Sequence, residues 1–241
     1  MSGHSKWATI KRAKGKTDAA RGKVFTKIGR ELAVAVKAGG PDPSANARLR
    51  DAIAKAKAAN MPNDNIQRGI KKAAGELGAI NFEAIIYEGY GPDGVAVIVE
   101  TLTDNKNRTA GEVRHIFDKS GGALATTGCV SYLFDTKGVI TVEKTAALTE
   151  DAVMADALDA GAEDFSDAGD VFEIITSAAD YAAVREAFEA KKYTVASSGI
   201  ERIPQNYVSV TNVEKFTRML DQFDESDDVQ QVFHNALDAG E

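Results

Sequence analysis

The order of strand-like and helix-like segments in residues 138–203 constrains the fold more than any other feature of the chain. Runs rich in Val, Ile, Phe and Tyr alternate there with two segments of helical periodicity, and turn residues separate them. The expected strands are 139–142, 163–165, 171–176 and the run that begins at 193–196. Thr149 is expected to begin the first helix, and Ser177 or Asp180 the second. The order β-α-β-β-α-β predicts a ferredoxin-like domain.

The segments on either side of this region form a second set of the same order. Before it, a strand at 95–103, a helix around Val113 and Phe117 and a strand at 129–134 are expected. After it come a strand at 207–210, a helix at 213–223 and a strand at 229–234. We therefore expect residues 138–203 to be inserted into a domain made of 79–135 and 205–241.

Residues 17–75 show helical periodicity throughout and predict three helices. Thr17 or Asp18 is expected to cap the first helix and Ser44 the second, and Asn63 or Asp64 is expected to start the third. Glycine or proline follows each helix. The fold class is thus α+β, with a basic N-terminal arm and three-helix domain over residues 1–78 and two ferredoxin-like α/β domains, one inserted in the other.

Charge is divided sharply along the chain. Residues 1–75 carry 17 Lys and Arg against 5 Asp and Glu, whereas the rest carries 12 against 31. The first thirty residues alone hold nine cations and one acid, Asp18, with the single tryptophan, Trp7, among them. Basic charge interleaved with an aromatic ring suits a phosphate backbone and a stacked base. A solvated tail has the same charge pattern, and Trp7 also suits a packing contact with the first helix.

Nucleic-acid contacts are expected from the arm, the outward faces of the three helices and the loop 103–109. The candidate residues are Lys6, Trp7, Lys11, Arg12, Lys14, Lys16, Arg21, Lys23, Lys27, Arg48, Lys55, Lys57, Arg68, Lys71, Lys72, Lys106 and Arg108. In the loop, Asp104 and Asn105 favour a helix cap, and the alternative is a polar edge at which Lys106 and Arg108 meet phosphate.

Catalytic, cofactor and metal sites are not expected. The G-x-G-x-x-G at 89–94 lies between two strands and contains Pro-Asp-Gly, so a hairpin is favoured over a dinucleotide site. The segment 121–128 lacks the lysine of a P-loop. Cys129 is expected to be a core thiol. The acidic run at 221–228 is interpreted as a solvated loop, since it lacks EF-hand spacing. One cysteine, short apolar runs and no apolar segment in the first ten residues indicate a cytoplasmic protein.

Several motifs resemble the YebC-type family. They are MSGHSKW at 1–7, RGKVFTK at 21–27, AKAANMP at 56–62, YEGYGP at 87–92, LTDNKNRT at 102–109 and Gly121-Gly122. The resemblance is specific up to about residue 134 and concerns mainly the layout beyond it. Cys129 and Ala125 depart from positions that are more often serine and glycine in the family.

The resemblance implies three domains and a cytoplasmic, non-enzymatic regulator of gene expression. Bacterial members of the family are described as probable DNA-binding transcriptional regulators. Mitochondrial relatives look like translational activators of cytochrome c oxidase, and some bacterial relatives are linked to ribosomes on proline-rich messages. Association with ribosomal RNA is the favoured function, DNA-binding transcriptional regulation is the alternative, and an adaptor that recruits a basic protein is a third hypothesis.

Overall fold

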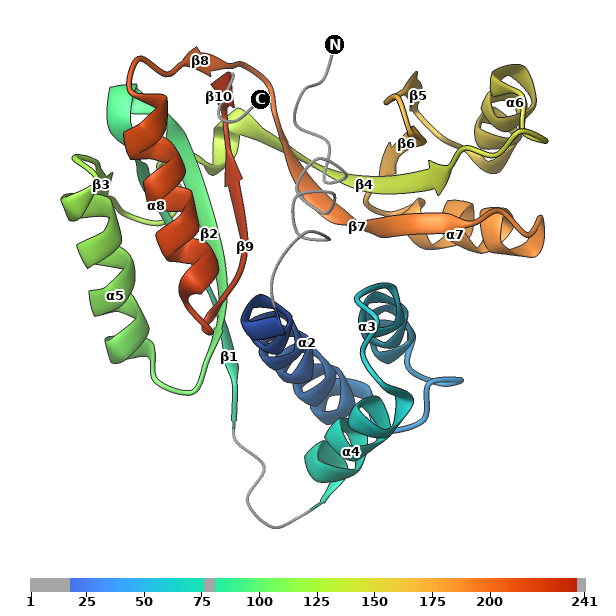
Figure 1. Cartoon of the computed structure of the whole chain (residues 1–241), viewed down its shortest axis with the longest axis horizontal. Helices are drawn as coiled ribbons and strands as arrows, with labels where there is room; N and C mark the ends of the chain where they lie inside the picture. Colours follow the sequence, from blue (N-terminus) through green and yellow to red (C-terminus); the bar gives the residue numbers. More distant parts are fainter. Residues whose placement is uncertain (1–17, 76–80, 238–241) are drawn as a thin grey trace. The chain divides into compact units, whose positions relative to one another are not determined.

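The computed structural model describes residues 18–75 and 81–237, which divide into two compact units (Figure 1). One unit comprises residues 134–205. The other combines the described residues up to 133 with those from 206 onward. The α+β fold class expected from the sequence is confirmed. Among the described residues, no helix is both long and apolar enough to cross a membrane.

Three helices form the basic N-terminal part: α2 (Asp18–Gly39), α3 (Ala47–Ala58) and α4 (Asn63–Ala74). Their apolar faces share one core, whose largest fully buried side chains are Leu32, Leu49 and Ile66. Helices α3 and α4, of 12 residues each, are too short to be stable alone, so this shared core holds them against α2.

The expected cap of the second helix is wrong. Asn46, and not Ser44, caps α3, because its side-chain oxygen accepts from the backbone N–H of Leu49 at 3.0 Å. The Asn46 amide also donates to the carbonyl oxygens of Ala35 and Gly40, at 2.8 and 2.9 Å. Asn46 is therefore both a cap and a buried link between α2 and α3. Ser44 instead closes the preceding turn through Asp42.

The same unit contains a four-stranded antiparallel sheet in the order β3-β1-β2-β9. Its strands are β1 (Glu83–Tyr90), β2 (Ala96–Thr103), β3 (Ala123–Leu124) and β9 (Val229–His234). Helices α5 (Lys106–Lys119) and α8 (Val213–Glu225) contribute Phe117, Phe216 and Phe223 to the core against this sheet. The expected hairpin between the first two strands is confirmed, with Asp93 at φ +59° in its turn.

Two details of this sheet differ from the expectation. The strand at 129–134 is absent: Cys129 lies in a bend, Ser131–Leu133 forms a short 3-10 helix, and Ala123–Leu124 pairs with β1 instead. The strand at 207–210 shrinks to β8 (Val208–Ser209), which pairs in parallel with β10 (Ala236–Leu237) outside the main sheet. The first strand of the hairpin takes the place expected for 207–210, because a tight turn sets it beside β2 at once.

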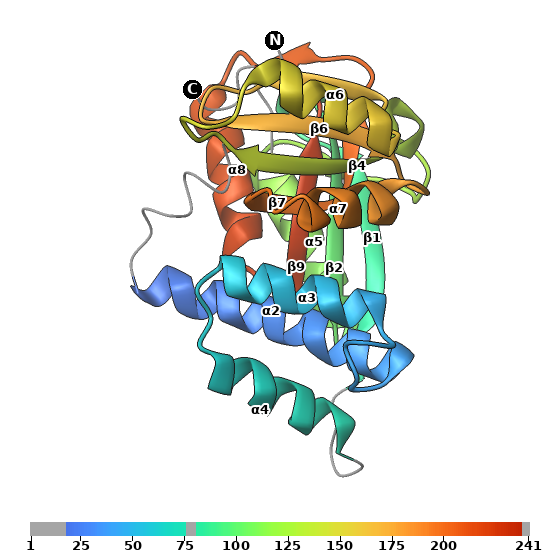
Figure 2. The same ribbon diagram turned by 90° about the vertical axis from the view of Figure 1, so that its right-hand side faces the viewer.

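The 134–205 unit has the element order β4 (Phe134–Glu143), α6 (Glu150–Ala160), β5 (Asp164–Asp167), β6 (Val171–Ser177), α7 (Tyr181–Ala190) and β7 (Val195–Pro204). All neighbours in its sheet, β5-β6-β4-β7, are antiparallel, which is the ferredoxin-like arrangement. Figure 2 shows α6 and α7 on one side of the strands. Thr149 caps α6 as predicted.

Candidate nucleic-acid interface

The six arm candidates, Lys6 to Lys16 with Trp7, lie outside the described residues, and Arg21 is described only as part of α2. The described candidates fall into two groups. The first group has exposed side chains that make no ion pair with any described residue. It consists of Arg48 and Lys57 on α3, Arg68, Lys71 and Lys72 on α4, and Lys106 at the start of α5.

Helix α4 concentrates three of these free cations on one face. Arg68, Lys71 and Lys72 are spaced i, i+3 and i+4, so their side chains are neighbours on the helix surface. The opposite face carries Ile66 and Ile70, which are buried in the three-helix core. The amphipathic pattern that folds this part of the chain therefore also directs these cations outward.

A groove of about 610 Å³ runs between α3 and α4. Ile53 and Ala54 contribute apolar surface to it, and Arg50 and Lys57 contribute positive charge. Arg50 also donates to the carbonyl oxygens of Pro43 and Ser44, at 3.3 and 3.1 Å, so its guanidinium is held at the groove. The side chains lining the groove suit a sugar-phosphate strand, since cations meet phosphate and the apolar surface meets sugars or bases.

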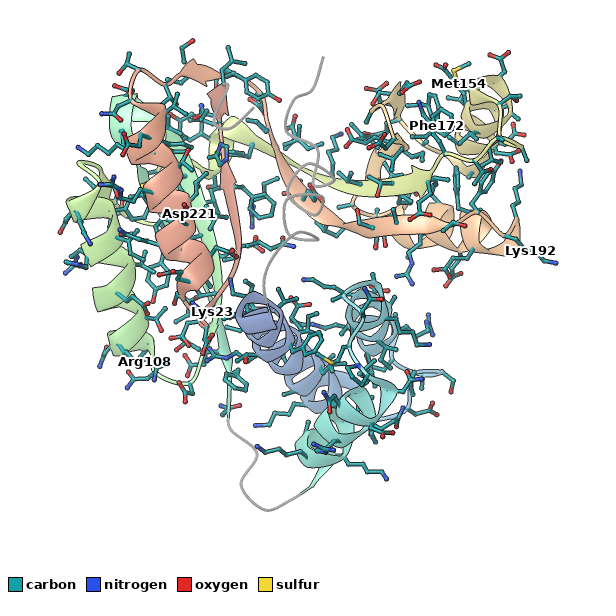
Figure 3. All side chains as sticks on the ribbon, viewed as in Figure 1. Lys23, Arg108, Met154, Phe172, Lys192 and Asp221 are labelled. Atoms are coloured by element: carbon teal, nitrogen blue, oxygen red, sulfur yellow. The ribbon has the colours of Figure 1, made fainter. Side chains whose placement is uncertain are left out.

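The second group of candidates is already engaged within the unit. Lys55 pairs with Glu31 on α2. The Nζ atom of Lys27 lies 3.2 Å from Asp224 Oδ1, and Lys23 donates to the backbone carbonyl of Glu225 at 3.3 Å. Lys23 and Lys27 therefore link α2 to the C-terminal end of α8 within this unit. Figure 3 labels Lys23 and Arg108 in this region.

Arg108 belongs to a buried cluster around Asp228, which was expected in a solvated loop and is instead 3% exposed. Arg108 Nη2 lies 2.8 Å from Asp228 Oδ2 and 2.7 Å from Asp104 Oδ1. Arg30 of α2 pairs with the other oxygen of Asp228. Thr109 donates to Asp228 Oδ2 at 2.6 Å. We call this set, completed by Thr103, the Asp228 cluster.

The electrostatics of the Asp228 cluster indicate a structural role. Burial works to raise the pKa of Asp228, but hydrogen bonds from Arg30, Thr109 and Arg108 outweigh it and lower the pKa to about 2. Hydrogen bonds to Asp228 and Asp104 raise the pKa of Arg108 further above its ordinary range. The cluster ties α2 to the start of α5 and of β9, so the three-helix part and the sheet are joined by a buried ion pair.

The capping interpretation of the loop 103–109 is confirmed. Asn105 is the N-cap of α5, and its side-chain oxygen accepts from the backbone N–H of Arg108 at 3.1 Å. Lys106 is exposed, while its carbonyl oxygen accepts from the Tyr87 hydroxyl at 3.4 Å. The side chain of Arg108 is half exposed, so one edge of its guanidinium faces solvent.

A second basic hollow, of about 300 Å³, was not anticipated from the sequence. It is lined by Lys119 and Ser120 at the end of α5 and by Asn212, Glu214, Lys215, Arg218 and Gln222 around α8. Glu214 pairs with Arg218 at 2.8 Å, whereas Lys119 and Lys215 make no ion pair with a described residue. The α5 residues and the α8 residues that line this hollow lie almost a hundred positions apart in the sequence. No local sequence pattern therefore predicts it.

The remaining candidate for chemistry is Cys129. Burial and the negative charge of Glu88 raise the pKa of its thiol, which is the opposite of what a thiolate nucleophile needs. Glu88 itself is buried and accepts from the backbone N–H groups of Gly128, Val130 and Ser131, at 2.8 to 2.9 Å. Cys129 thus belongs to a loop fixed by Glu88.

Comparison with known proteins covers almost the whole chain. Residues 5–76 match the model of the TACO1/YebC protein N-terminal domain, and residues 82–236 match that of the TACO1/YebC second and third domain. A relative from Acetivibrio thermocellus is 57% identical over 98% of both chains, and one from Clostridium botulinum is 59% identical over 98% of this chain and 97% of its own. Both are named probable transcriptional regulatory proteins. The crystal structure of a conserved hypothetical protein from Aquifex aeolicus is 45% identical, with a TM-score of 0.83 over 92% of each chain.

Proposed function

Because the chain belongs to the TACO1/YebC family, we propose that it is a non-enzymatic, nucleic-acid-binding regulator of gene expression that acts in the cytoplasm on ribosomal RNA. The observation that carries this proposal is the exposed, unpaired basic surface of α3 and α4. We call Arg48, Lys57, Arg68, Lys71 and Lys72 together with the groove between these helices the basic helical surface. The basic arm, residues 1–16, precedes these helices in the sequence and adds further cationic side chains.

Three features favour structured RNA over a DNA operator. The cations are spread over two helices and an arm, whereas a DNA reader concentrates its contacts on one recognition helix. The groove offers apolar surface beside its cations, which suits unpaired and unstacked bases. The arm is lysine-rich with a single tryptophan, a composition that suits phosphate and a splayed base. The family resemblance adds a more specific role, which is to assist the translation of proline-rich stretches.

DNA-binding transcriptional regulation is the second candidate, and one observation favours it. Helices α3 and α4 are joined by the short segment 59–62, as in a helix-turn-helix. The first half of α4 exposes Asn63, Asn65 and Gln67 next to Arg68. Amide and guanidinium side chains near the start of a recognition helix read base edges in the major groove. The names of the two relatives described above agree with this candidate.

Crosslinking in cells, followed by sequencing of the attached nucleic acid, separates the two candidates. Dominance of ribosomal RNA supports the translational function, whereas discrete promoter fragments support the transcriptional one. Complexes that survive nuclease treatment with no enriched nucleic acid would contradict both and favour the protein adaptor.

A triple variant tests the surface itself. Replacing Arg68, Lys71 and Lys72 with Gln removes three unpaired cations, so the slope of log affinity against log salt should fall in magnitude by about 2 on single strands or about 3 on duplex. The matched control replaces Lys137, Lys144 and Lys191, which are paired with carboxylates in the other unit. Equal slopes for the wild type and the α4 variant would contradict a role for the basic helical surface.

A further inference from the structure

The hollow of about 300 Å³ between α5 and α8 lies apart from the basic helices, and we call it the α5–α8 hollow. Figure 1 shows α5 and α8 side by side, and both pack on the same core. Lys119 and Ser120 at the end of α5 meet Asn212, the cap of α8, at the hollow. The 13 residues of α8 place this end about 20 Å from Glu225, the contact of Lys23 on α2. The hollow is therefore separate from the junction with α2.

The lining of the α5–α8 hollow is positively charged. Three cations, Lys119, Lys215 and Arg218, face one carboxylate, Glu214, which leaves a net charge of +2. Glu214 pairs with Arg218 at 2.8 Å, but both side chains are at least 66% exposed, so this pair is weak and does not neutralise the lysines. The amino end of α8 is partially positive and the carboxyl end of α5 partially negative, so the helix dipoles oppose each other there. The side chains therefore decide the sign of the potential.

The ammonium group of Lys215 lies close to α5, beside a glycine. A Cβ atom at residue 121 would lie 2.5 Å from Lys215 Nζ, so a side chain there would push the ammonium away. Gly121 has a φ of +71°, which favours glycine for a second reason. The charge of Lys215 also helps to lower the pKa of Asp93, although hydrogen bonds from Thr211 contribute more. Lys215 Nζ forms no hydrogen bond within the described part of the chain, so its donors are available to a ligand.

Ser120 adds a donor that is buried and has no partner. The residue is 5% exposed and lines the hollow. Its backbone N–H donates to the Ile116 carbonyl at 3.1 Å, whereas its hydroxyl has no hydrogen-bond partner among residues 18–75 and 81–237. The Asn212 side-chain oxygen accepts from the backbone N–H of Lys215 at 2.9 Å, which leaves the Asn212 NH2 group as a further donor. A hydroxyl and an amide beside ammonium groups are the partners that an oxyanion needs.

The composition of the lining identifies the oxyanion. None of its seven side chains is aromatic or aliphatic, so the hollow offers no surface on which a base could stack. A phosphate group uses cations and neutral donors together and needs no such surface. We propose that the α5–α8 hollow binds a backbone phosphate of the nucleic acid, as a second contact in addition to the basic helical surface. The identity of this ligand rests on the proposed function.

Two separate contacts change how a nucleic acid is held. A strand bound at the basic helical surface meets the α5–α8 hollow at an effective concentration on the order of millimolar, if it is long enough to reach both. A weak phosphate contact then adds to the affinity. Because the contact is made to phosphate alone, it should be independent of base sequence.

A salt titration of RNA binding tests the hollow. Lys119→Gln with Lys215→Gln removes two cations, so the slope of log affinity against log salt should fall in magnitude by about 1.4 on single strands, or about 1.8 on duplex. Lys119→Arg with Lys215→Arg keeps the charge and should keep the slope. Glu214→Gln removes the carboxylate of the lining and should tighten binding, which is a change of opposite sign.

Two controls separate the hollow from a general effect of charge. Lys191→Gln with Lys192→Gln makes the same change in charge after α7, in the other unit, and should leave the slope unchanged. Acetylation of the unaltered protein, read by mass spectrometry, gives a second measurement that needs no variant. RNA should protect Lys119 and Lys215 from acetylation and leave Lys192 reactive.

The outcomes distinguish this inference from the proposed function. Equal slopes for wild type and the Lys119/Lys215 glutamine variant, or acetylation of both lysines that RNA does not change, would overturn the inference. A slope that falls in the α4 triple variant alone would do so while supporting the basic helical surface. A slope that falls in the hollow variant alone would support the hollow and remove that surface.

Other ligands of the hollow are tested by the same acetylation assay. Protection of Lys119 and Lys215 by inorganic pyrophosphate but not by RNA would indicate a small phosphate ligand. Protection by polyglutamate but not by RNA would indicate an acidic protein segment. Either result would overturn the assignment to a nucleic-acid backbone.

Discussion

The Asp228 cluster gives the sharpest prediction about stability. Asp228→Asn keeps the shape of the side chain and an acceptor oxygen but removes the charge shared by Arg30 and Arg108. The fall in the pKa of Asp228 from 3.8 to about 2 corresponds to about 2.4 kcal/mol. Leaving Arg30 buried without a counterion adds to this loss, and the half exposure of Arg108 limits it. We expect Asp228→Asn to reduce the free energy of unfolding by about 2–4 kcal/mol at pH 7.

The pH dependence of this difference follows from the direction of the shift. Because the pKa of Asp228 is lower in the folded protein than in the unfolded chain, its stabilising effect is complete above about pH 5 and is lost as the pH falls through 4 towards 2. Roughly half of the 2.4 kcal/mol should already be lost at pH 3. Wild type and Asp228→Asn should therefore converge in stability on acidification.

Urea denaturation followed by circular dichroism measures both quantities. Asp104→Asn is the matched control, since Asp104 contacts the same guanidinium at 2.7 Å but lies at the surface. Such an exposed pair contributes less than about 1 kcal/mol. Equal unfolding free energies for wild type and Asp228→Asn at pH 7 would refute the argument. So would a difference between them that stays constant from pH 7 to pH 3.

Three further predictions concern other parts of the chain. Asn105→Ala should cost about 0.5–2 kcal/mol by urea denaturation and leave nucleic-acid affinity unchanged, because Asn105 caps α5; lost affinity at unchanged stability would make it a contact residue. Replacing the five cations of residues 1–16 with Gln should reduce the magnitude of the salt slope by about 3.5 on single strands, or by about 4.5 on duplex, whereas Trp7→Ala should weaken binding by about 1–3 kcal/mol with little change in slope. If the arm is only a solvated tail, a salt titration would show equal slopes for the wild type and the charge variant. Excision of residues 138–203 with a short glycine linker should leave a remainder that unfolds cooperatively, and a broad, non-cooperative transition would count against an inserted domain.

The sequence by itself determined the features that depend on neighbouring residues. Thr149 and Asn105 cap their helices because a cap needs only its own side chain and an N–H three residues on. The turn at 91–94 follows from Pro-Asp-Gly for the same reason. Alternation of apolar side chains likewise predicts the strands of the 134–205 unit and their order along the chain. The outward direction of Arg68, Lys71 and Lys72 follows from helical periodicity alone.

Tertiary structure decided every feature whose partners lie far apart in the sequence. Asp228 meets Arg108 across 120 residues and Arg30 across 198, so an acidic run that reads as a solvated loop contains a buried ion-pair centre. Three other features depend on packing between elements or on contacts between residues distant in the sequence. They are the inner position of β1 in its sheet, the cap at Asn46 and the hollow between Lys119 and Lys215. The free energy of a charge depends on its three-dimensional surroundings, and residue order along the chain does not specify them.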